Sequence, residues 1–363
     1  MNLLRAPLSA VVVVVVVLAL VAAAPAQGAG FVDVLDTPSL ISPLASKSLL
    51  QSVVRAGDRI VAVGQRGHLV ISSDGGATWK QSPVPVASDL TAVYFVDDRQ
   101  GWVVGHDGVI LHTGDGGEKW DLQLNGLTAN DLLVSAMEHK VAADPVSEEA
   151  KKLLAEAQRY KDQGADKPFL DVWFADTLNG YAVGAYNLIF KTADGGKSWQ
   201  SWFDRTENPK FFNLYAIRPA AGGLYISGEG GLVLKLDVAG QHFKAVSPQY
   251  NGSLFGVADA GNAVLAYGLR GNVFRSDDGG AHWTKVNAGL QASVVGTTRT
   301  AQGAMVLADV GGRLAASTDG AQSFTRLTLK NPMPLTAIAD IGEGRFALAG
   351  PRGVAVVEAV AAH

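Results

Sequence analysis

The chain has 363 residues, of which 48% are hydrophobic, 18% are charged and 42 are glycine, and its formal net charge is −4. This composition favours many short strands joined by tight turns, and the mildly negative net charge gives no indication of the concentrated basic surface that nucleic-acid binding requires. The sequence contains no cysteine, so the fold must hold without disulfides and offers no cysteine for lipidation.

The N-terminal residues, 1–26, predict a secretory signal peptide. Arg5 precedes an unbroken apolar stretch from Ala10 to Ala24, and small residues follow this stretch. The stretch is shorter than the ~20 residues that a membrane-spanning helix needs. A charged start, a short apolar segment and a small-residue cleavage site are typical of export signals. Cleavage fits after Ala26 or after Gly28, and we expect a periplasmic or secreted protein.

Beyond the signal, a unit of roughly forty residues recurs seven times. The recurring apolar strand begins at Leu50, Leu90, Leu170, Leu214, Leu254, Val294 and Leu335. Each copy predicts four strands, which in the second copy are Leu90–Val96, Gly101–Val104, Val109–Thr113 and a strand at Trp120. Four-stranded units repeated around an axis form β-propellers. The repeat therefore predicts an all-β, seven-bladed propeller that is a single domain over residues 31–363.

The turn between the third and fourth strands carries the pattern S/T-x-D-G-G-x-x-W/F, known as the Asp box. We predict a structural role, in which the carboxylate accepts backbone N–H groups of the turn and the aromatic ring packs between blades. In the fourth copy Val238 replaces the aspartate, while Phe243 keeps the aromatic position. The predicted structural residues are Asp74, Trp79, Asp115, Trp120, Asp194, Trp199, Asp278, Trp283, Asp319 and Phe324.

The turn between the second and third strands predicts the functional surface. The residue two places after the first turn glycine, or its equivalent, is Arg66, Asp107, Tyr186, Gly230, Arg270, Gly311 or Arg352, and Arg313 lies one residue after its turn. A guanidinium group suits carboxylates, carbonyls and phosphates. We predict a partner-binding rim made of Arg66, Arg270, Arg352, Arg313, Asp107 and Tyr186. The alternative is that arginine before glycine is merely a soluble turn residue.

Two segments depart from the repeat. The seventh copy stops without a fourth strand, so we expect residues 31–34 to supply that strand and close the ring. Residues from about 125 to 168 form an insertion between the second and third blades, with a helix predicted over Ser147–Gln163 and a shorter one over Asn130–Val141. An apolar stripe of Ala150, Leu153, Leu154, Ala157 and Tyr160 lies at helical spacing. The insertion either packs this stripe on the propeller or docks a partner on the same face as the arginine rim.

Catalytic signals are absent from the sequence. It has no nucleophile-elbow, phosphate-loop or zinc-protease motif, and the seven histidines lack metal-ligand spacing. We therefore expect no enzyme activity, no cofactor and no metal. A glycan-binding or glycosidase-type propeller is the alternative, but glycosidases need two converging carboxyl groups. Acids outside the Asp boxes, such as Asp107 and Asp171, form no persuasive pair.

The segments Gly101–Trp120 and Gly180–Trp199 closely resemble the photosystem II stability/assembly factor family of Asp-box (BNR-type) propellers. The resemblance implies a non-catalytic protein that binds exposed segments of membrane-complex subunits and is lumenal in a photosynthetic host. It also implies an arginine patch on one face, whose nearest counterparts are Arg66, Arg270 and Arg352. In a non-photosynthetic host a membrane transporter is the alternative partner. We expect a monomer with a protein partner and no nucleic acid.

Overall fold

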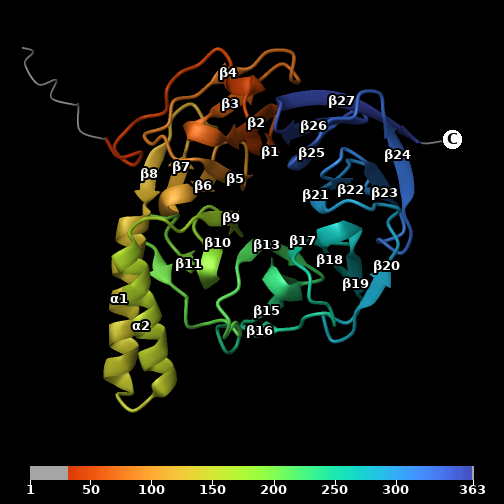
Figure 1. Cartoon of the computed structure of the whole chain (residues 1–363). Helices are drawn as coiled ribbons and strands as arrows, with labels where there is room; N and C mark the ends of the chain where they lie inside the picture. Colours follow the sequence, from red (N-terminus) through yellow and green to blue (C-terminus); the bar gives the residue numbers. More distant parts are fainter. Residues whose placement is uncertain (1–31, 362–363) are drawn as a thin grey trace, which may run out of the picture. The chain divides into compact units, whose positions relative to one another are not determined.

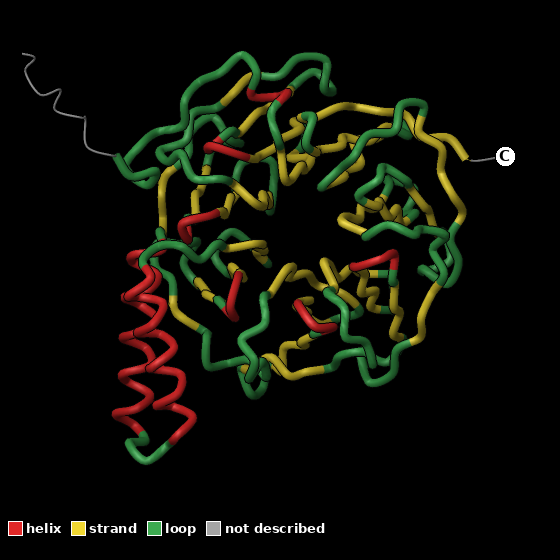
Figure 2. The backbone as a smooth tube through the Cα atoms, viewed as in Figure 1, coloured by secondary structure: helices red, strands yellow, loops and turns green. Residues whose placement is uncertain are grey.

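Antiparallel ladders dominate residues 32–361, the part of the chain that the computed structural model describes. In this part, five sheets have four strands each, and a sixth sheet has seven. The sheets are arranged around a central axis (Figure 1), and two helices extend away from them (Figure 2). The predicted signal peptide, residues 1–26, lies outside the described residues.

The first strand of each repeat lies nearest the axis (Figure 1). Small residues near the start of these strands let the sheets approach one another there, and an irregularity in pairing follows the first residue of most of them. These strands are β1 (Leu50–Ala56), β5 (Leu90–Phe95), β9 (Phe169–Phe174), β13 (Leu214–Ala220), β17 (Leu254–Asp259), β21 (Val294–Arg299) and β25 (Ala337–Gly342).

The second and third strands carry most of the buried surface. Most of their residues are apolar or small, and β6, with the sequence GWVVG, is buried along its whole length. The second strands are β2 (Arg59–Gly64), β6 (Gly101–Gly105), β10 (Gly180–Gly184), β14 (Gly223–Gly228), β18 (Val264–Gly268), β22 (Met305–Asp309) and β26 (Arg345–Gly350). The third strands are β3 (Leu69–Ser72), β7 (Ile110–Thr113), β11 (Ile189–Thr192), β15 (Val233–Asp237), β19 (Val273–Ser276), β23 (Leu314–Ser317) and β27 (Gly353–Ala361).

The outer strands are short and mostly exposed. They are β4 (Lys80–Gln81), β8 (Asp121–Leu124), β12 (Gln200–Ser201), β16 (His242–Ala245), β20 (Thr284–Val286) and β24 (Thr325–Leu329). The hydrophobic core lies between neighbouring sheets. Between the first two sheets, for example, Leu69, Val103 and Trp120 belong to one buried cluster.

Five of the seven predicted strand starts agree with the structure; the seventh strand begins at Ala337 and not at Leu335, and the third is displaced by one residue at the insertion. In the second repeat the strands lie within about a residue of their predicted bounds. In the third repeat the residue equivalent to Leu90 is Phe169, not Leu170, because Leu90 pairs with Gly105 and Phe169 pairs with Gly184. Because the insertion interrupts the forty-residue spacing, the start of this strand could not be located by counting from Leu90.

The prediction that residues 31–34 supply a missing outer strand is wrong for the described part of that segment. Asp33–Asp36 form a turn, and the carbonyl of Val34 accepts the Ala87 amide at 2.9 Å. This contact lies between the first two sheets. The seventh repeat is completed differently, since β27 is nine residues long and pairs with both β26 and β24. Its far end therefore continues the preceding four-stranded set and makes the seven-stranded sheet.

The first and last repeats meet without a shared strand. Leu50, Val53 and Ile60 lie in one buried cluster with Ala339 and Ala347. The Thr336 hydroxyl also donates to the carbonyl of Leu50 at 2.8 Å, across 286 residues of sequence. Side-chain packing and one hydrogen bond thus join the two ends of the repeat array.

The insertion is a helical hairpin of α1 (Gly126–Ala143) and α2 (Glu148–Gln163). Helix α2 matches its prediction, since the Ser147 side chain accepts the Ala150 amide and Gly164 ends the helix with φ +82°. Helix α1 is longer than predicted, because Asn125 caps it through the Thr128 amide. The predicted start at Asn130 overlooked this cap.

Candidate functional site

Five turns between second and third strands share one backbone conformation. Each is a short 3-10 turn whose middle residue has φ between 53° and 63°. Non-glycine residues are uncommon in this left-handed region, and each costs of order 1–2 kcal/mol. The turns are η2 (Gln65–Gly67), η3 (His106–Gly108), η4 (Ala185–Asn187), η5 (Glu229–Gly231) and η6 (Leu269–Gly271), with Arg66, Asp107, Tyr186, Gly230 and Arg270 in the middle.

Hydrogen bonds to the neighbouring sheet hold the strained residues in place. The amide of Arg66 donates to Asp89 Oδ1 at 2.7 Å, and that of Tyr186 donates to Asn213 Oδ1 at 2.9 Å. Asp89 and Asn213 each immediately precede the innermost strand of the next sheet. The turns therefore stay rigid while the side chains of Arg66, Tyr186 and Arg270 remain exposed.

Arg313 and Arg352 lie at the same end of their strands but in turns of other geometry. Asp309 Oδ1 accepts the amides of Gly311 and Arg313, both at 2.9 Å, and Gly312 takes the positive φ. Pro351 and Arg352 form a two-residue connection before Gly353, whose φ is +95°. Both arginines are exposed. Of the three arginines predicted at the shared turn position, Arg66 and Arg270 thus have the same backbone conformation and Arg352 does not, while Arg313 was predicted one residue after its turn.

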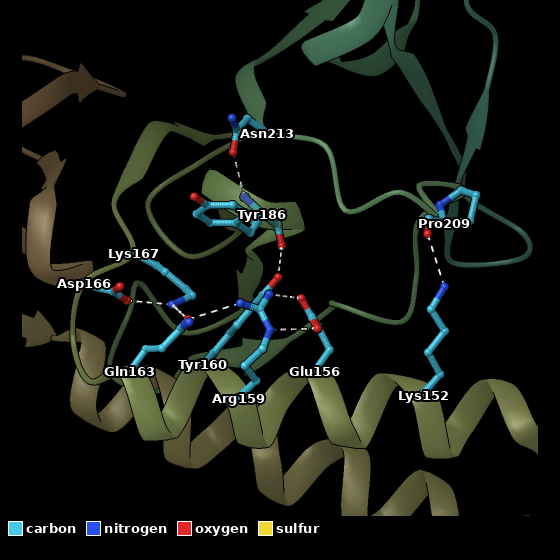
Figure 3. A network of polar contacts seen from close by, with 10 residues as sticks. All are labelled: Lys152, Glu156, Arg159, Tyr160, Gln163, Asp166, Lys167, Tyr186, Pro209 and Asn213. Atoms are coloured by element: carbon cyan, nitrogen blue, oxygen red, sulfur yellow. Dashed lines mark hydrogen bonds and ion pairs between the residues drawn. The ribbon is translucent and has the colours of Figure 1, made fainter.

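The base of the helical hairpin joins this end of the sheets. The Tyr160 hydroxyl on α2 donates to the carbonyl of Tyr186 at 3.0 Å, and their ring centroids are 6.2 Å apart (Figure 3). Lys167 Nζ lies 4.6 Å from the Tyr160 ring centroid and pairs with Asp166 at 2.6 Å. The hairpin therefore contacts and supports η4, and it lies on the face that carries the arginine-bearing turns.

We call the five turn-centre residues, with Arg313 and Arg352, the turn rim.

The apolar stripe of the hairpin packs against the sheets, which is the first of the two interpretations that the sequence left open. Leu153, Ala157 and Tyr160 are buried in one cluster with Phe169 and Phe203. At the other side of the hairpin, Lys140 Nζ forms an ion pair with Asp204 at 2.7 Å. Of the predicted stripe, only Leu154 is not fully buried.

The Asp boxes occupy the opposite ends of the strands. Asp74 Oδ1 accepts the amide of Thr78 at 2.9 Å, while its Oδ2 accepts the Thr78 hydroxyl. Hydrogen bonds from the Thr78 hydroxyl and amide lower the pKa of Asp74 to about 2, and Ser198 does the same to Asp194. Side chains of the preceding repeat also donate to carbonyl groups of the box. Arg59 Nη1, for example, donates to the carbonyl of Gly116 at 2.8 Å.

Residues 32–361 contain no group of three His, Asp or Glu side chains arranged to hold a metal ion. Within the same range, neither helix is both long and apolar enough to cross a membrane. Asp171, one of the acids considered for glycosidase chemistry, is paired with Arg218 at 2.5 Å. Sequence inspection missed this pair, although a comparison of equivalent strand positions across the repeats would have isolated both residues.

Solved structures share this fold. "YCF48 bound to D1 peptide" is 16% identical, with a TM-score of 0.61, over 88% of this chain and 98% of the other. YCF48 from Cyanidioschyzon merolae is 17% identical, with a TM-score of 0.59, over 87% of this chain and 97% of the other. The WD40 β-propeller domain of Doa1 is 10% identical with a TM-score of 0.60, and covers 90% and 96%. At these identities the likeness establishes an all-β, propeller-like fold.

Sequence relatives and a family model identify the family. The chloroplastic photosystem II stability/assembly factor HCF136 of Arabidopsis thaliana is 24% identical over 260 residues, 62% of this chain and 64% of that protein. The chain thus matches less than two thirds of that relative. The photosystem II assembly lipoprotein Ycf48 of Synechococcus sp. (strain CC9902) is 27% identical over 141 residues, 38% and 42% of the two chains. The model for photosynthesis system II assembly factor YCF48 matches residues 44–149 and 154–326, so the chain belongs to that family.

Proposed function

We propose that this protein is an exported, non-catalytic assembly or accessory factor that binds an exposed segment of a membrane protein through the turn rim. The observation that carries the proposal is the set of five turns in one repeated conformation, three of which hold an exposed side chain, at Arg66, Tyr186 and Arg270. Backbone rigidity reduces the entropy lost on binding. The family description and the relative solved with a D1 peptide supply the class of partner.

The finer architecture belongs to the same proposal. We take β25–β27 as a seventh blade, which makes residues 31–363 a single seven-bladed propeller. The pairing of β27 with β24 is then a link between the last two blades. Export to a periplasm, or to a lumen in a photosynthetic host, is supported by the apolar segment before residue 26 and by the chloroplastic and lipoprotein relatives. We expect a monomer that needs no cofactor.

The chemistry of the rim favours an acidic or carbonyl-rich peptide. Arg66, Arg270, Arg313 and Arg352 supply four exposed guanidinium groups, whose planar forks can each bind a carboxylate through two hydrogen bonds. Glycosidase chemistry has less support, because the Asp171 carboxylate is occupied by Arg218 and the Ile217 amide.

Charge reversal on the rim tests the proposal. The triple variant R66E/R270E/R352E should keep the fold, because each side chain is exposed, and should lose at least about tenfold in affinity for its partner. Affinity for the D1 peptide, measured by fluorescence anisotropy, is the defined readout. Capture from detergent-solubilised native membranes, followed by mass spectrometry, extends the assay to other membrane proteins.

A matched control is K285E/R326E/K330E, which changes the net charge equally on exposed residues at the outer strands. This control should bind as the unchanged protein does. Equal loss in both variants, or retained binding by the rim variant, would overturn the proposed site. A third variant that replaces residues 126–164 by a short Gly-Ser linker reports whether the hairpin also contacts the partner.

A further inference from the structure

The innermost strands enclose a cavity of about 600 Å³. This volume is within the usual range for small-molecule sites. Aromatic and charged side chains share the lining, among them Tyr94, Trp173, Tyr215, Arg218 and Phe255. No step of the proposed rim function uses this cavity.

Three neighbouring sheets break the repeat pattern at the cavity. Opposite the next-to-last residue of the second strand, six innermost strands carry a small residue, and only β9 carries a charge, Asp171. The six residues are Ser52, Ala92, Ala216, Gly256, Gly296 and Ala337. On β13, Arg218 occupies a position that is uncharged in the other six innermost strands. On β18, the partner of Gly256 is Tyr267, where the other second strands have valine, serine or alanine.

The hydrogen bonds of Arg218 leave one edge of its guanidinium group available. Its Nη1 donates to Asp171 Oδ2 at 2.5 Å and to the carbonyl of Ile217 at 2.7 Å. Among the described residues, Nε and Nη2 have no hydrogen-bond partner, although the group is only about one-third exposed. The ring of Tyr94 lies 5.7 Å from the guanidinium carbon. Asp171 thus orients the arginine, and the paired donors Nε and Nη2 remain for a ligand.

Tyr267 adds a second unpartnered polar group. Its side chain is 6% exposed and lines the cavity, and within residues 32–361 no partner for its hydroxyl is found. A Cβ on Gly256 would lie 2.2 Å from that hydroxyl oxygen, so glycine makes room for the tyrosine to reach the innermost layer. Burial raises the pKa of Tyr267, and the charges of Arg218 and Asp171 also act on it. The hydroxyl is therefore a neutral donor close to the ion pair.

We propose that this cavity binds a small free organic acid, with its carboxylate on Nε and Nη2 of Arg218 and on the hydroxyl of Tyr267. An Nε/Nη2 edge accepts a carboxylate through two parallel hydrogen bonds. The aromatic rings favour an apolar or aromatic body, since Tyr215 and Phe255 already form an edge-on pair at 5.5 Å. The site is separate from the turn rim, and neither depends on the other.

The test uses 3-phenylpropionate as the probe, the mature chain as the protein and isothermal titration calorimetry as the readout. For a ligand of this size we expect a Kd of about 0.1 mM. The neutral isostere 3-phenylpropionamide should bind at least about tenfold more weakly. R218Q should lose at least about tenfold and Y267F roughly fivefold in affinity for the acid. The exposed control R326Q should bind it unchanged.

Equal affinity for the acid and the amide would overturn the proposal, as would no binding of the acid at about 10 mM. Since R218Q leaves Asp171 buried without its partner, circular dichroism must first show that it folds. If it does not fold, Y267F decides, because it removes only a hydroxyl group that has no partner among the described residues. Wild-type affinity of Y267F for the acid would then disprove the proposed site. The rim variant should retain acid binding, so the two proposals fail independently.

Discussion

The side chain of Tyr267 leaves no room for a Cβ atom at position 256 in the innermost layer. Glycine also occupies the same register in β21, at Gly296. A Cβ on Gly256 would lie 2.2 Å from Tyr267 ring and hydroxyl atoms, whereas one on Gly296 would lie 3.3 Å from Ile338 Cγ2. The two positions therefore differ in available space, although both backbones lie in the same kind of strand.

We predict that Gly256→Ala lowers the free energy of unfolding by about 2–3 kcal/mol, because the buried Tyr267 ring must shift. Gly296→Ala should cost less than about 1 kcal/mol, since a contact of 3.3 Å needs only a small adjustment. Urea denaturation of both variants measures the difference. Similar losses would show that Tyr267 is not held where the structure has it.

The turn-centre residues show what sequence can say at the residue scale. The pattern of glycine spacing located Arg66, Asp107, Tyr186, Gly230 and Arg270 at one position, and the structure gives them one backbone conformation. The pattern was insufficient for Arg352, because Pro351 changes the turn. It was also silent on Tyr267, whose significance depends on the glycine across the ladder.

At the scale of single elements, the pKa of each Asp-box carboxylate is set mainly by donors within its own turn. Hydroxyl and amide donors within four residues stabilise each ionised carboxylate. They hold the pKa values of Asp74 and Asp194 at about 2, below the usual 3.8. A lowered native pKa contributes stability that is complete above about pH 4 and is lost as the pH falls toward 2.

We predict that the melting temperature falls between pH 4 and about pH 2.5, and that D74N/D194N shows a shallower fall over this window. The double variant removes two groups that take up protons more readily in the unfolded state. Differential scanning calorimetry at several pH values gives both slopes. Parallel curves would indicate that other carboxylates control acid unfolding.

The helical hairpin was predictable to the extent that its signals are local. The Ser147 cap, the Gly164 stop and the stripe spacing define α2 within the sequence. The Asn125 cap of α1 follows directly on strand β8, so the strand pattern concealed it. Only the fold shows that Tyr160 reaches across to Tyr186 and attaches the hairpin to a turn of the rim.

At the scale of the whole molecule, β27 determines how the repeat array ends. It pairs with β26 over six residue pairs and with β24 over three. The segment Asp33–Asp36 forms no such ladder, because it is an exposed or half-buried turn. The two chain ends therefore contribute unequally to stability.

We predict that a chain ending at Gly350 fails to fold cooperatively, because the loss of β27 uncovers Leu348, Leu329 and their buried cluster. Removal of residues 1–36 should cost no more than about 1–2 kcal/mol, mainly through the hydrogen bond at Val34 and the packing of Leu35. Urea unfolding followed by tryptophan fluorescence compares the two truncations. A stable C-terminal truncation together with an unstable N-terminal one would reverse this assignment.

By itself, the sequence determined the repeat, the strand order within each unit, the Asp boxes and the shared position of the five turn-centre residues. All of these depend on residues close together in the chain, where glycine placement and alternating apolar residues act directly on the backbone. Only the tertiary structure decided that β27 is shared and that Asp171, Arg218 and Tyr267 meet at the axis. Those features depend on pairing register, and a shift of one residue turns each side chain to the opposite face of its sheet.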